Sequence, residues 1–531
     1  MSALGLALAA CGGGSSDKTT SNQGQTPANE GKPTPGGSVT NLLESETAAG
    51  FCPPQGTWAI SGIMVAQAIY DTLTAPNLQG KFVPYLAKSV TPSADYKTWT
   101  IGLRDGVKFQ NGQPVDAAAI AQNITAWKTG QLFQFVYKNI DTVTATNPTT
   151  VTVTTTTPWP SFAGYLYLDG RAAIAAPAQL DNTNTCPTNM IGSGPFKLKE
   201  WKPNDHLTAT KNPDYWQKDK NGVQLPYLAS ITFKPVVEAA QRLNDFKAGQ
   251  DTMMHTTDPP EIEQLNGLGS SQAKVYAEPD GHRENRYYLL NTSTAPFDDI
   301  NARKAFAMAV DRNTLIQLNA KGEDKADGPF DKGVPGYLSN PGFPQHNLAE
   351  AKKLVTAYKN AHGGQFHILL EATNDPANVN EAQTIKEQIQ KAGISADIDQ
   401  EDQSSFISTA LGGKFSVMLW RNHPGDTPDL QYFWWNTGSP INFGKFNDPQ
   451  LQQLLDQGRA ATTDAQRKPI YEAINRRFAS QVYNLWGYYI RWVIAAKPNV
   501  NGVLGPPLPD NGGQPQYLYG RLPVLGLWIK S

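Results

Sequence analysis

The chain lacks an excess of positive charge and lacks long apolar runs, and each absence excludes a class of protein. Its 531 residues hold 45 lysines and arginines against 47 acidic residues, with an isoelectric point near 6.4. Without a basic excess or a lysine and arginine cluster, we expect no nucleic-acid partner. The apolar run at residues 1–10 is about half the length of a membrane-spanning helix, so it is no transmembrane anchor.

Common enzyme signatures are also missing. The sequence has no glycine-rich phosphate loop, no HExxH, no CxxC and no G-x-S-x-G motif. His362 and His367 have no cysteine or third histidine nearby to complete a tetrahedral set, so we expect no metal and no cofactor. Carboxylates are plentiful, and the alternative of an exported hydrolase stays open. The prediction is a protein that is not an enzyme.

Cys11 stands where a short apolar segment meets a polar one. Leu8-Ala9-Ala10-Cys11 resembles the lipobox of bacterial lipoproteins, in which the cysteine is acylated and becomes the first residue. Residues 12–37 hold almost no apolar side chain and suit a flexible tether. We therefore interpret 1–11 as a signal-peptide remnant with a lipidated Cys11. The alternative is a free cysteine in a disordered leader.

The two other cysteines form an even pair once Cys11 carries lipid. In an oxidising compartment Cys52 and Cys186 are expected to form a disulfide. The alternative is two unrelated buried thiols.

Local patterns predict a mixed α/β protein with more than one core. With 39% apolar and 10% aromatic residues, the length suggests two to four domains. Alternation predicts strands near 99–103 and 149–157, and helical spacing predicts helices near 115–128 and 299–310. Asn378 is expected to cap a helix that stops at Gly393, and Asp448 and Thr463 are expected to cap two late helices.

Several stretches together resemble family 5 of the extracytoplasmic solute-binding proteins of ABC importers, the group with oligopeptide- and dipeptide-binding members. The resemblance is carried by IYDTLTAPNLQGKF with its continuation to residue 124, by IGSGPFKLKEW in 191–216, by ENRYYLLNTSTAPF in 284–312, and by FNDPQLQQLL in 446–480. These segments follow the family's order and cover nearly everything after residue 37.

The resemblance implies an α/β, two-lobed periplasmic-binding-protein-like clamp of type II, in the family 5 variant with an extra subdomain in lobe I. Lobe I comprises 38–284 with an inserted subdomain at about 80–190, lobe II comprises 285–486, and 487–531 returns to lobe I. Two crossover strands form the hinge. A solute that contacts both lobes only when they close shifts the population toward the closed state.

The function implied is capture of a solute, an oligopeptide above all, and its delivery to a permease and ATPase complex by a monomer tethered outside the cytoplasm. The same clamp binding an oligosaccharide or another small organic molecule is one alternative. A lipoprotein sensor that signals without transport is another.

Ligand contacts are implied mainly for residues 417–446, which resemble the lobe II segment that runs along the solute. The side chains assigned to the ligand are Leu419, Trp420, Arg421, Trp58 and Tyr488.

In peptide-binding relatives an aspartate after this strand meets the α-amino group, because a buried ammonium needs a carboxylate. Counting from Trp420 without a gap places His423 at that position, and an insertion brings Asp426 there instead. Thr427-Pro428 also looks like a helix start, so the alternative is that Asp426 only shapes a turn.

Overall fold

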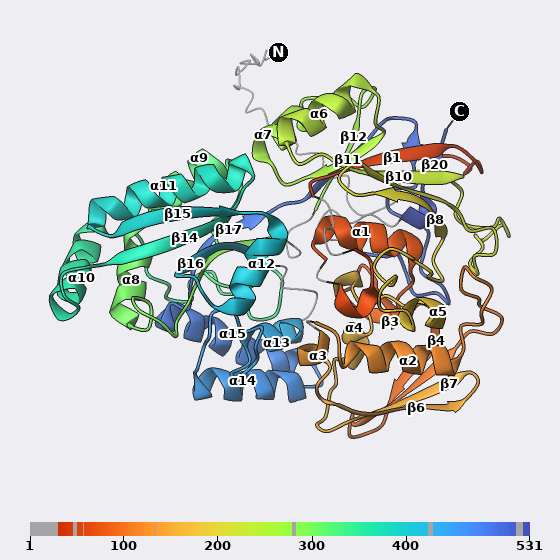
Figure 1. Cartoon of the computed structure of the whole chain (residues 1–531), viewed down its shortest axis with the longest axis horizontal. Helices are drawn as coiled ribbons and strands as arrows, with labels where there is room; N and C mark the ends of the chain where they lie inside the picture. The colour runs from red at the N-terminus through yellow and green to blue at the C-terminus, as the bar shows by residue number, and fades with distance from the viewer. Residues whose placement is uncertain are drawn as a thin grey trace, which may run out of the picture.

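Three β-sheets organise the part of the chain that the structure describes. This structure is a computed structural model, and it describes residues 30–45, 50–56, 58–131, 133–278, 283–422, 428–516 and 524–530. Cys11, His423 and Asp426 lie outside these residues. Two bodies stand side by side, one with the seven-stranded sheet (lobe I) and one with the five-stranded sheet (lobe II) (Figure 1).

The seven-stranded sheet takes strands from both ends of the chain. In spatial order it consists of β12 (Lys274–Ala277), β18 (Val493–Ala496), β11 (Met253–Thr256), β1 (Ser38–Leu43), β10 (Ser230–Pro235), β9 (His206–Lys211) and β8 (Phe196–Lys202). β1 runs parallel to β10 and β11, whereas β8, β9, β12 and β18 pair antiparallel. Three helices accompany this sheet, α1 (Ile60–Ile69), α6 (Ala239–Ala248) and α7 (Pro259–Asn266). α1 is buried on nearly all sides, as its uniformly apolar sequence requires.

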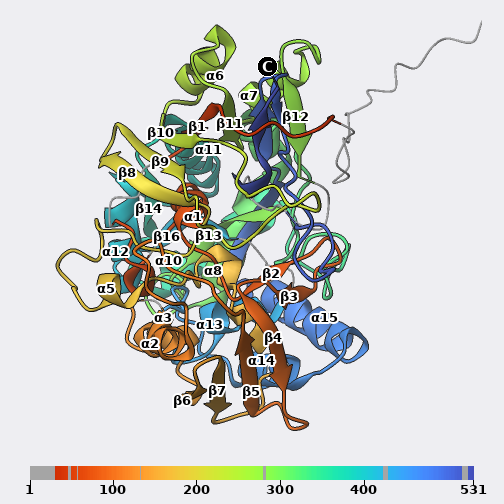
Figure 2. The same ribbon diagram turned by 90° about the vertical axis from the view of Figure 1, so that its right-hand side faces the viewer.

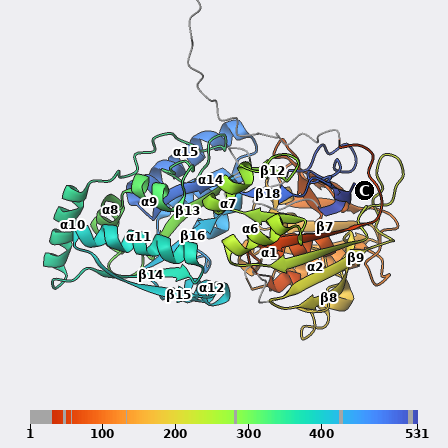
Figure 3. The same cartoon turned by 90° about the horizontal axis from the view of Figure 1, so that it is seen from above.

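The five-stranded sheet lies entirely between residues 284 and 490. Its spatial order is β15 (Ser395–Glu401), β14 (His367–Thr373), β16 (Val417–Asn422), β13 (Glu284–Leu290) and β17 (Asn484–Ile490). β14 is parallel to β15 and β16, and β13 is antiparallel to β16 and β17. The helices of this part are α8 (Ile300–Ala309), α9 (Arg312–Asn319), α10 (Leu348–Ala361), α11 (Pro376–Ala392), α12 (Gln403–Gly412), α13 (Tyr432–Trp435), α14 (Pro449–Ala460) and α15 (Asp464–Gln481). Figure 3 shows α8 and α10 at the end of this body that is farthest from lobe I.

A four-stranded antiparallel sheet forms a separate layer at the end of the molecule opposite α6 (Figure 2). Its spatial order is β4 (Ala87–Pro92), β5 (Thr98–Leu103), β7 (Thr150–Thr155) and β6 (Ile140–Asn147). The associated helices are α2 (Ala117–Trp127), α3 (Phe133–Val136), α4 (Phe162–Tyr165) and α5 (Pro177–Leu180). Two short strand pairs complete the list, β2 (Thr74–Pro76) with β3 (Phe82–Pro84) and β19 (Val500–Asn501) with β20 (Trp528–Ile529).

The chain crosses between the lobes twice, and the two crossings lie next to each other. It leaves after β12 into β13 and returns from β17 into β18, and in both lobes the two strands involved are hydrogen-bonded neighbours. At the crossing itself the Glu278 amide donates to the Trp492 carbonyl at 2.9 Å. Two adjacent strands of this kind are a suitable hinge, because few dihedral angles must change for the lobes to move.

Most predicted local elements are confirmed, and one cap is corrected. β5, β7, α2 and α8 form where alternation and helical spacing predicted them. The Asp448 cap is confirmed, and so is the Thr463 capping box. The prediction for Asn378 was wrong, because α11 begins three residues earlier than that cap requires and Asp375 caps it by accepting from the Asn378 amide at 3.0 Å. Pro376 at the first helical position explains the earlier start.

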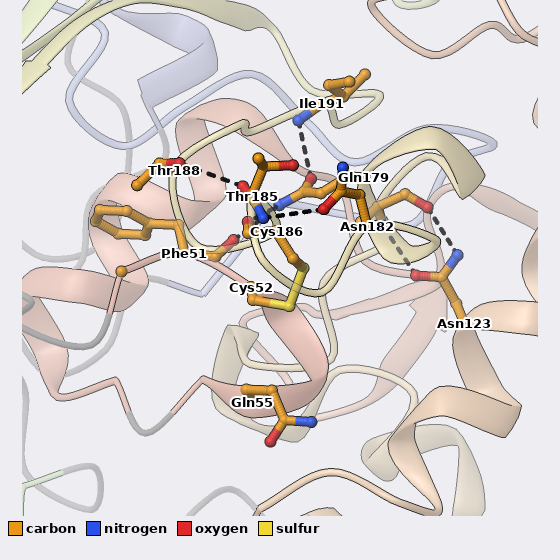
Figure 4. The surroundings of a disulfide bond; sticks show 12 residues. Phe51, Cys52, Gln55, Asn123, Gln179, Asn182, Thr185, Cys186, Thr188 and Ile191 are labelled. Carbon is orange, nitrogen blue, oxygen red and sulfur yellow. Dashed lines mark hydrogen bonds between the residues drawn. A yellow bond between two sulfur atoms is a disulfide. The ribbon is translucent and has the colours of Figure 1, made fainter.

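The disulfide between Cys52 and Cys186 is confirmed. Its Cα atoms are 5.0 Å apart, and it joins the loop before α1 to the segment after α5. Figure 4 shows Gln179 beside it, where the amide group donates to the Phe51 carbonyl at 3.1 Å and to the Cys186 carbonyl at 2.8 Å. The bridge and this buried amide tie the same two segments together.

Removing the disulfide is expected to destabilise the protein strongly. The bridge spans a sequence separation of 134 residues, for which the chain-entropy model gives on the order of 5 kcal/mol. The double variant Cys52→Ser, Cys186→Ser should therefore unfold at a clearly lower urea concentration than the oxidised wild type. Reductant should lower the wild-type midpoint and leave that of the variant unchanged. Equal midpoints for oxidised and reduced wild type would contradict the expectation.

Candidate functional site

Arg421 and Glu44 join the two lobes at the carboxyl ends of their sheets. Glu44 follows β1 of the seven-stranded sheet, and Arg421 is the penultimate residue of β16 in the five-stranded sheet. The Arg421 guanidinium donates to the Glu44 carboxylate. Solutes bind outside the carboxyl ends of the strands in open α/β sheets, so this junction is the candidate site.

A second carboxylate and an indole ring complete the surroundings of Arg421. Its Nε lies 4.0 Å from Glu284 Oε2, and its guanidinium carbon lies 5.2 Å from the centre of the Trp492 ring. Burial lowers the pKa of the Arg421 guanidinium, but the Glu44 and Glu284 carboxylates outweigh this and raise the pKa above the usual arginine value. Arg421 is therefore a permanent cation between two acidic groups.

Trp492 and His255 connect this cation to lobe I. The Trp492 indole N–H donates to Glu284 Oε2 at 2.8 Å, and the Trp492 ring stacks on the His255 imidazole with centres 5.0 Å apart. The Glu44 amide donates to His255 Nε2 at 3.1 Å, which fixes that nitrogen as an acceptor. The start of the hinge, the end of β1 and the end of β11 thus meet at one point.

Tyr488 lies in one cross-strand row with Arg421. Arg286 of β13 is opposite Arg421 on one side and opposite Tyr488 of β17 on the other. The Glu381 carboxylate of α11 accepts from Arg286 Nε at 3.0 Å and also from the Tyr288 hydroxyl. Burial, together with the Glu381 carboxylate, raises the pKa of Tyr488. The row keeps β16 in register, and Arg421 extends from its end.

The other residues assigned to the ligand lie in the two cores. Trp420 stacks on Phe406 of α12 with ring centres 5.5 Å apart, and Leu419 is opposite Tyr288 inside the sheet. Trp58, just before α1, is 2% exposed, and its indole N–H donates to the Gly50 carbonyl at 2.9 Å. The structure brings Arg421 and Tyr488 into one row and places Trp58 in the core of lobe I. The ligand roles of all five stay predictions.

A second buried contact joins lobe II to the segment around α4. Asp429 accepts from Arg459 Nε at 3.1 Å, and its backbone carbonyl accepts from the Tyr165 hydroxyl at 2.6 Å. The Ser161 hydroxyl donates to the same carboxylate, and Arg459 Nη2 donates to the Tyr165 oxygen at 2.6 Å. Asp429 and Arg459 are 2% and 6% exposed, so this pair is shielded from water. The Asp429–Arg459 pair of lobe II is therefore packed directly against Ser161 and Tyr165.

The structure separates the two histidines that the sequence analysis considered for metal. The His362 ring stacks on Tyr358 with centres 4.2 Å apart, and His367 Nε2 lies 3.4 Å from the Asp397 carboxylate.

Within the described ranges, none of the helices combines the length and hydropathy that a bilayer crossing requires.

Comparison with known proteins identifies the family. The profile described as bacterial extracellular solute-binding proteins, family 5 Middle, matches residues 81–444. The chain belongs to this family. Its members bind solutes outside the cytoplasm for ABC importers and are not enzymes, which confirms the predicted class of protein.

Relatives differ in the solute that their names specify. The nickel-binding periplasmic protein of Escherichia coli strain K12 is 26% identical over 83% of this chain and 87% of its own length. The oligopeptide-binding protein OppA of Bacillus subtilis strain 168 is 26% identical over 94% and 95% of the two chains.

Solved structures confirm the two-lobed fold. AgaA of A. tumefaciens R10, in complex with agropinic acid, has a TM-score of 0.80 at 24% identity, covering 93% of this chain and 99% of its own. AppA of Bacillus subtilis, in complex with a nonapeptide, also has a TM-score of 0.80, at 19% identity over 94% and 100% of the chains.

Sequence reasoning missed Glu44, Asp429 and Arg459. Each is an ordinary charged residue in a segment with no motif, and its partner lies more than 25 residues away along the chain. The only local signal was the position of Glu44 directly after a strand with apolar residues. Such a residue reaches the carboxyl edge of a sheet, but its partner from the other lobe is set by the tertiary fold.

Asp429→Asn is expected to weaken the lobe contact around α4. The change leaves the Arg459 guanidinium buried without its counter-charge, a loss of about 3 kcal/mol. Amide hydrogen exchange of residues 159–166 should speed up, and the melting temperature should fall. Asp456→Asn is the matched control, because Asp456 is exposed and accepts hydrogen bonds from Tyr432 and Gln452. Equal effects of the two substitutions would contradict a special role for the Asp429–Arg459 pair.

Proposed function

We propose that this chain is a membrane-tethered solute-binding protein that captures an oligopeptide between its lobes and delivers it to an ABC import permease. Membership in the family supports the solute-binding role, and the Arg421–Glu44 junction supports the place and the chemistry. A guanidinium and two carboxylates at one lobe boundary offer counter-charges to both ends of a zwitterion. A peptide with free termini is such a molecule.

The mechanism follows from competition for these charges. In the structure, Arg421 is neutralised by Glu44 from the opposite lobe. A solute carboxylate at the boundary takes over part of the guanidinium, and a solute ammonium is attracted to the acidic groups, so both lobes gain contacts only when they close. In this proposal the solute lies along the strands that carry Leu419, Trp420 and Tyr488, and Trp58 stabilises the part of lobe I that faces the solute.

The proposed lobes follow the sheets. Residues 38–284 and 487–531 form lobe I, with an inserted subdomain at about 80–190, and 285–486 form lobe II. The division is supported by the strands of the seven-stranded sheet, which belong to lobe I, and by those of the five-stranded sheet, which belong to lobe II. β17 continues in the five-stranded sheet past residue 486 to Ile490. The four-stranded sheet of residues 87–155 supports the inserted subdomain.

The peptide proposal is tested at Asp426, the residue assigned to the α-amino group. Asp426→Asn should weaken binding of a free-amine peptide by about tenfold or more in calorimetry, because a charge-assisted hydrogen bond is worth roughly 1.5 to 3 kcal/mol. Binding of the N-acetylated peptide should hardly change. His423→Asn is the matched variant for the ungapped alignment.

Other outcomes redirect the assignment. Equal weakening for both peptides, with a lower melting temperature of the empty protein, would mean that Asp426 shapes a turn. No heat with any peptide, together with a different solute detected by mass spectrometry after purification, would replace the oligopeptide by a non-peptide ligand. Binding without import in cells would favour the sensor.

We propose that Cys11 carries the membrane anchor. Two acyl chains anchor a protein stably where one chain is marginal, so lipidated protein should fractionate with membranes. Cys11→Ser should leave the protein unprocessed or release it from the membrane fraction, with no acyl mass on the mature chain. Unchanged membrane fractionation of the variant would remove the proposal.

A further inference from the structure

The carboxylates of Glu371, Asp399 and Glu401 lie together at the edge of the five-stranded sheet, away from the Arg421–Glu44 junction. Glu371 of β14 is directly opposite Asp399 in the parallel ladder with β15, and Glu401 follows two residues later on the same face. One carboxylate oxygen from each residue lies within 4.8 Å of the others. Like charges placed opposite each other across a sheet repel, so this arrangement needs compensation.

Glu371 is the most deeply buried member of the cluster. It is 2% exposed, and its Oε2 is buried and accepts no hydrogen bond from the described residues. Glu401 Oε2 is buried and unbonded as well, whereas Glu401 Oε1 accepts from the Thr409 hydroxyl of α12 at 2.7 Å. Two orphaned carboxylate oxygens inside a protein are costly unless a cation or a proton occupies the space between them.

No basic side chain in the described part of the chain forms an ion pair with any of the three. By contrast, the Asp397 carboxylate, two residues before Asp399 on β15, lies 3.4 Å from His367 Nε2. Burial, with the added repulsion of Asp399 and Glu401, raises the pKa of Glu371 to about 7. The negative charge of the cluster is thus not balanced by the protein.

The cluster is separate from the candidate solute site. Glu371 is opposite Met418 of β16, and Met418 and Arg421 are three residues apart, so their side chains extend from opposite faces of the sheet. The cluster lies on the face covered by α12, whose Phe406 stacks on Trp420. Figures 1 and 3 show α12 on the side of lobe II nearest to lobe I.

We infer that Glu371, Asp399 and Glu401 form a binding site for a divalent cation of the calcium type. Three carboxylates offer only oxygen ligands, which hard cations such as Ca²⁺ prefer. Calcium–oxygen bonds of about 2.3 to 2.6 Å let one ion contact oxygens that lie up to about 5 Å apart. Asp399 is exposed and gives the ion a path from solvent. The bound ion neutralises the β14–β15 edge and, through Thr409, holds α12 against it.

The test uses the full chain, dialysed against EDTA and then against metal-free buffer. Titration with CaCl2 in a calorimeter should give one site with a Kd on the order of 10⁻⁴ to 10⁻³ M, the range of extracellular calcium modules. CaCl2 should raise the melting temperature, and NaCl at equal ionic strength should not.

Three variants locate the site. Glu371→Gln should abolish the calcium-dependent rise in melting temperature without lowering the melting temperature of the metal-free protein, because it removes a repelled charge. Asp399→Asn, at an exposed position, should weaken calcium binding by about tenfold or more and keeps the test valid if Glu371→Gln does not fold. Asp397→Asn, on the same strand outside the cluster, is the matched control and should bind calcium like the wild type.

Two results would overturn the inference. In the first, CaCl2 produces no heat of binding in the wild type and no change in its melting temperature. The stability of the wild type then falls as the pH rises toward about 7, whether or not CaCl2 is present. A proton would then occupy the cluster, since a raised carboxyl pKa stabilises the fold only at lower pH. In the second, Asp397→Asn and Asp399→Asn weaken calcium binding equally, which would show that calcium is attracted to the surface charge in general and not bound by the cluster.

Discussion

The ion pair between Arg421 and Glu44 links the two lobes of this clamp. It is formed by residues more than 370 positions apart, and each is held at the carboxyl end of a different sheet. Arg421 is placed by the row through Arg286 and Tyr488, and Glu44 by its amide bond to His255. Both charges are thus held in place by contacts within their own lobes, and such preorganisation favours tight recognition of a charged molecule.

Two further constraints determine how the lobes can move around that pair. The adjacent crossings near Glu278 and Trp492 restrict motion to a hinge, and Trp492 contacts both Glu284 and His255 at the same place. The Asp429–Arg459 pair holds lobe II against α4 far from the hinge in sequence. A solute that binds at the Arg421–Glu44 junction therefore acts on two lobes that share a defined axis and a second buried contact.

Much of the local structure could be predicted from the sequence, because it depends on neighbours along the chain. The Thr463 capping box and the alternation of β5 are of this kind, and the family resemblance supplied the order of the lobes. Contacts between distant segments could not be predicted. Asn378 and Asp375 are both capping residue types, and the helix begins after Asp375, where Pro376 follows. The cluster at Glu371 exists only because β14 and β15 pair in one register.

Arg421 is proposed to couple solute binding to lobe closure, and small-angle X-ray scattering of the full chain measures this coupling. Wild type freed of solute should become more compact when a saturating free peptide is added. Arg421→Gln should bind that peptide about tenfold or more weakly and, even at saturation, compact less, whereas Arg476→Gln, an exposed control on α15, should behave like wild type. Equal affinity and equal compaction of Arg421→Gln and wild type would show that Arg421 does not couple the two.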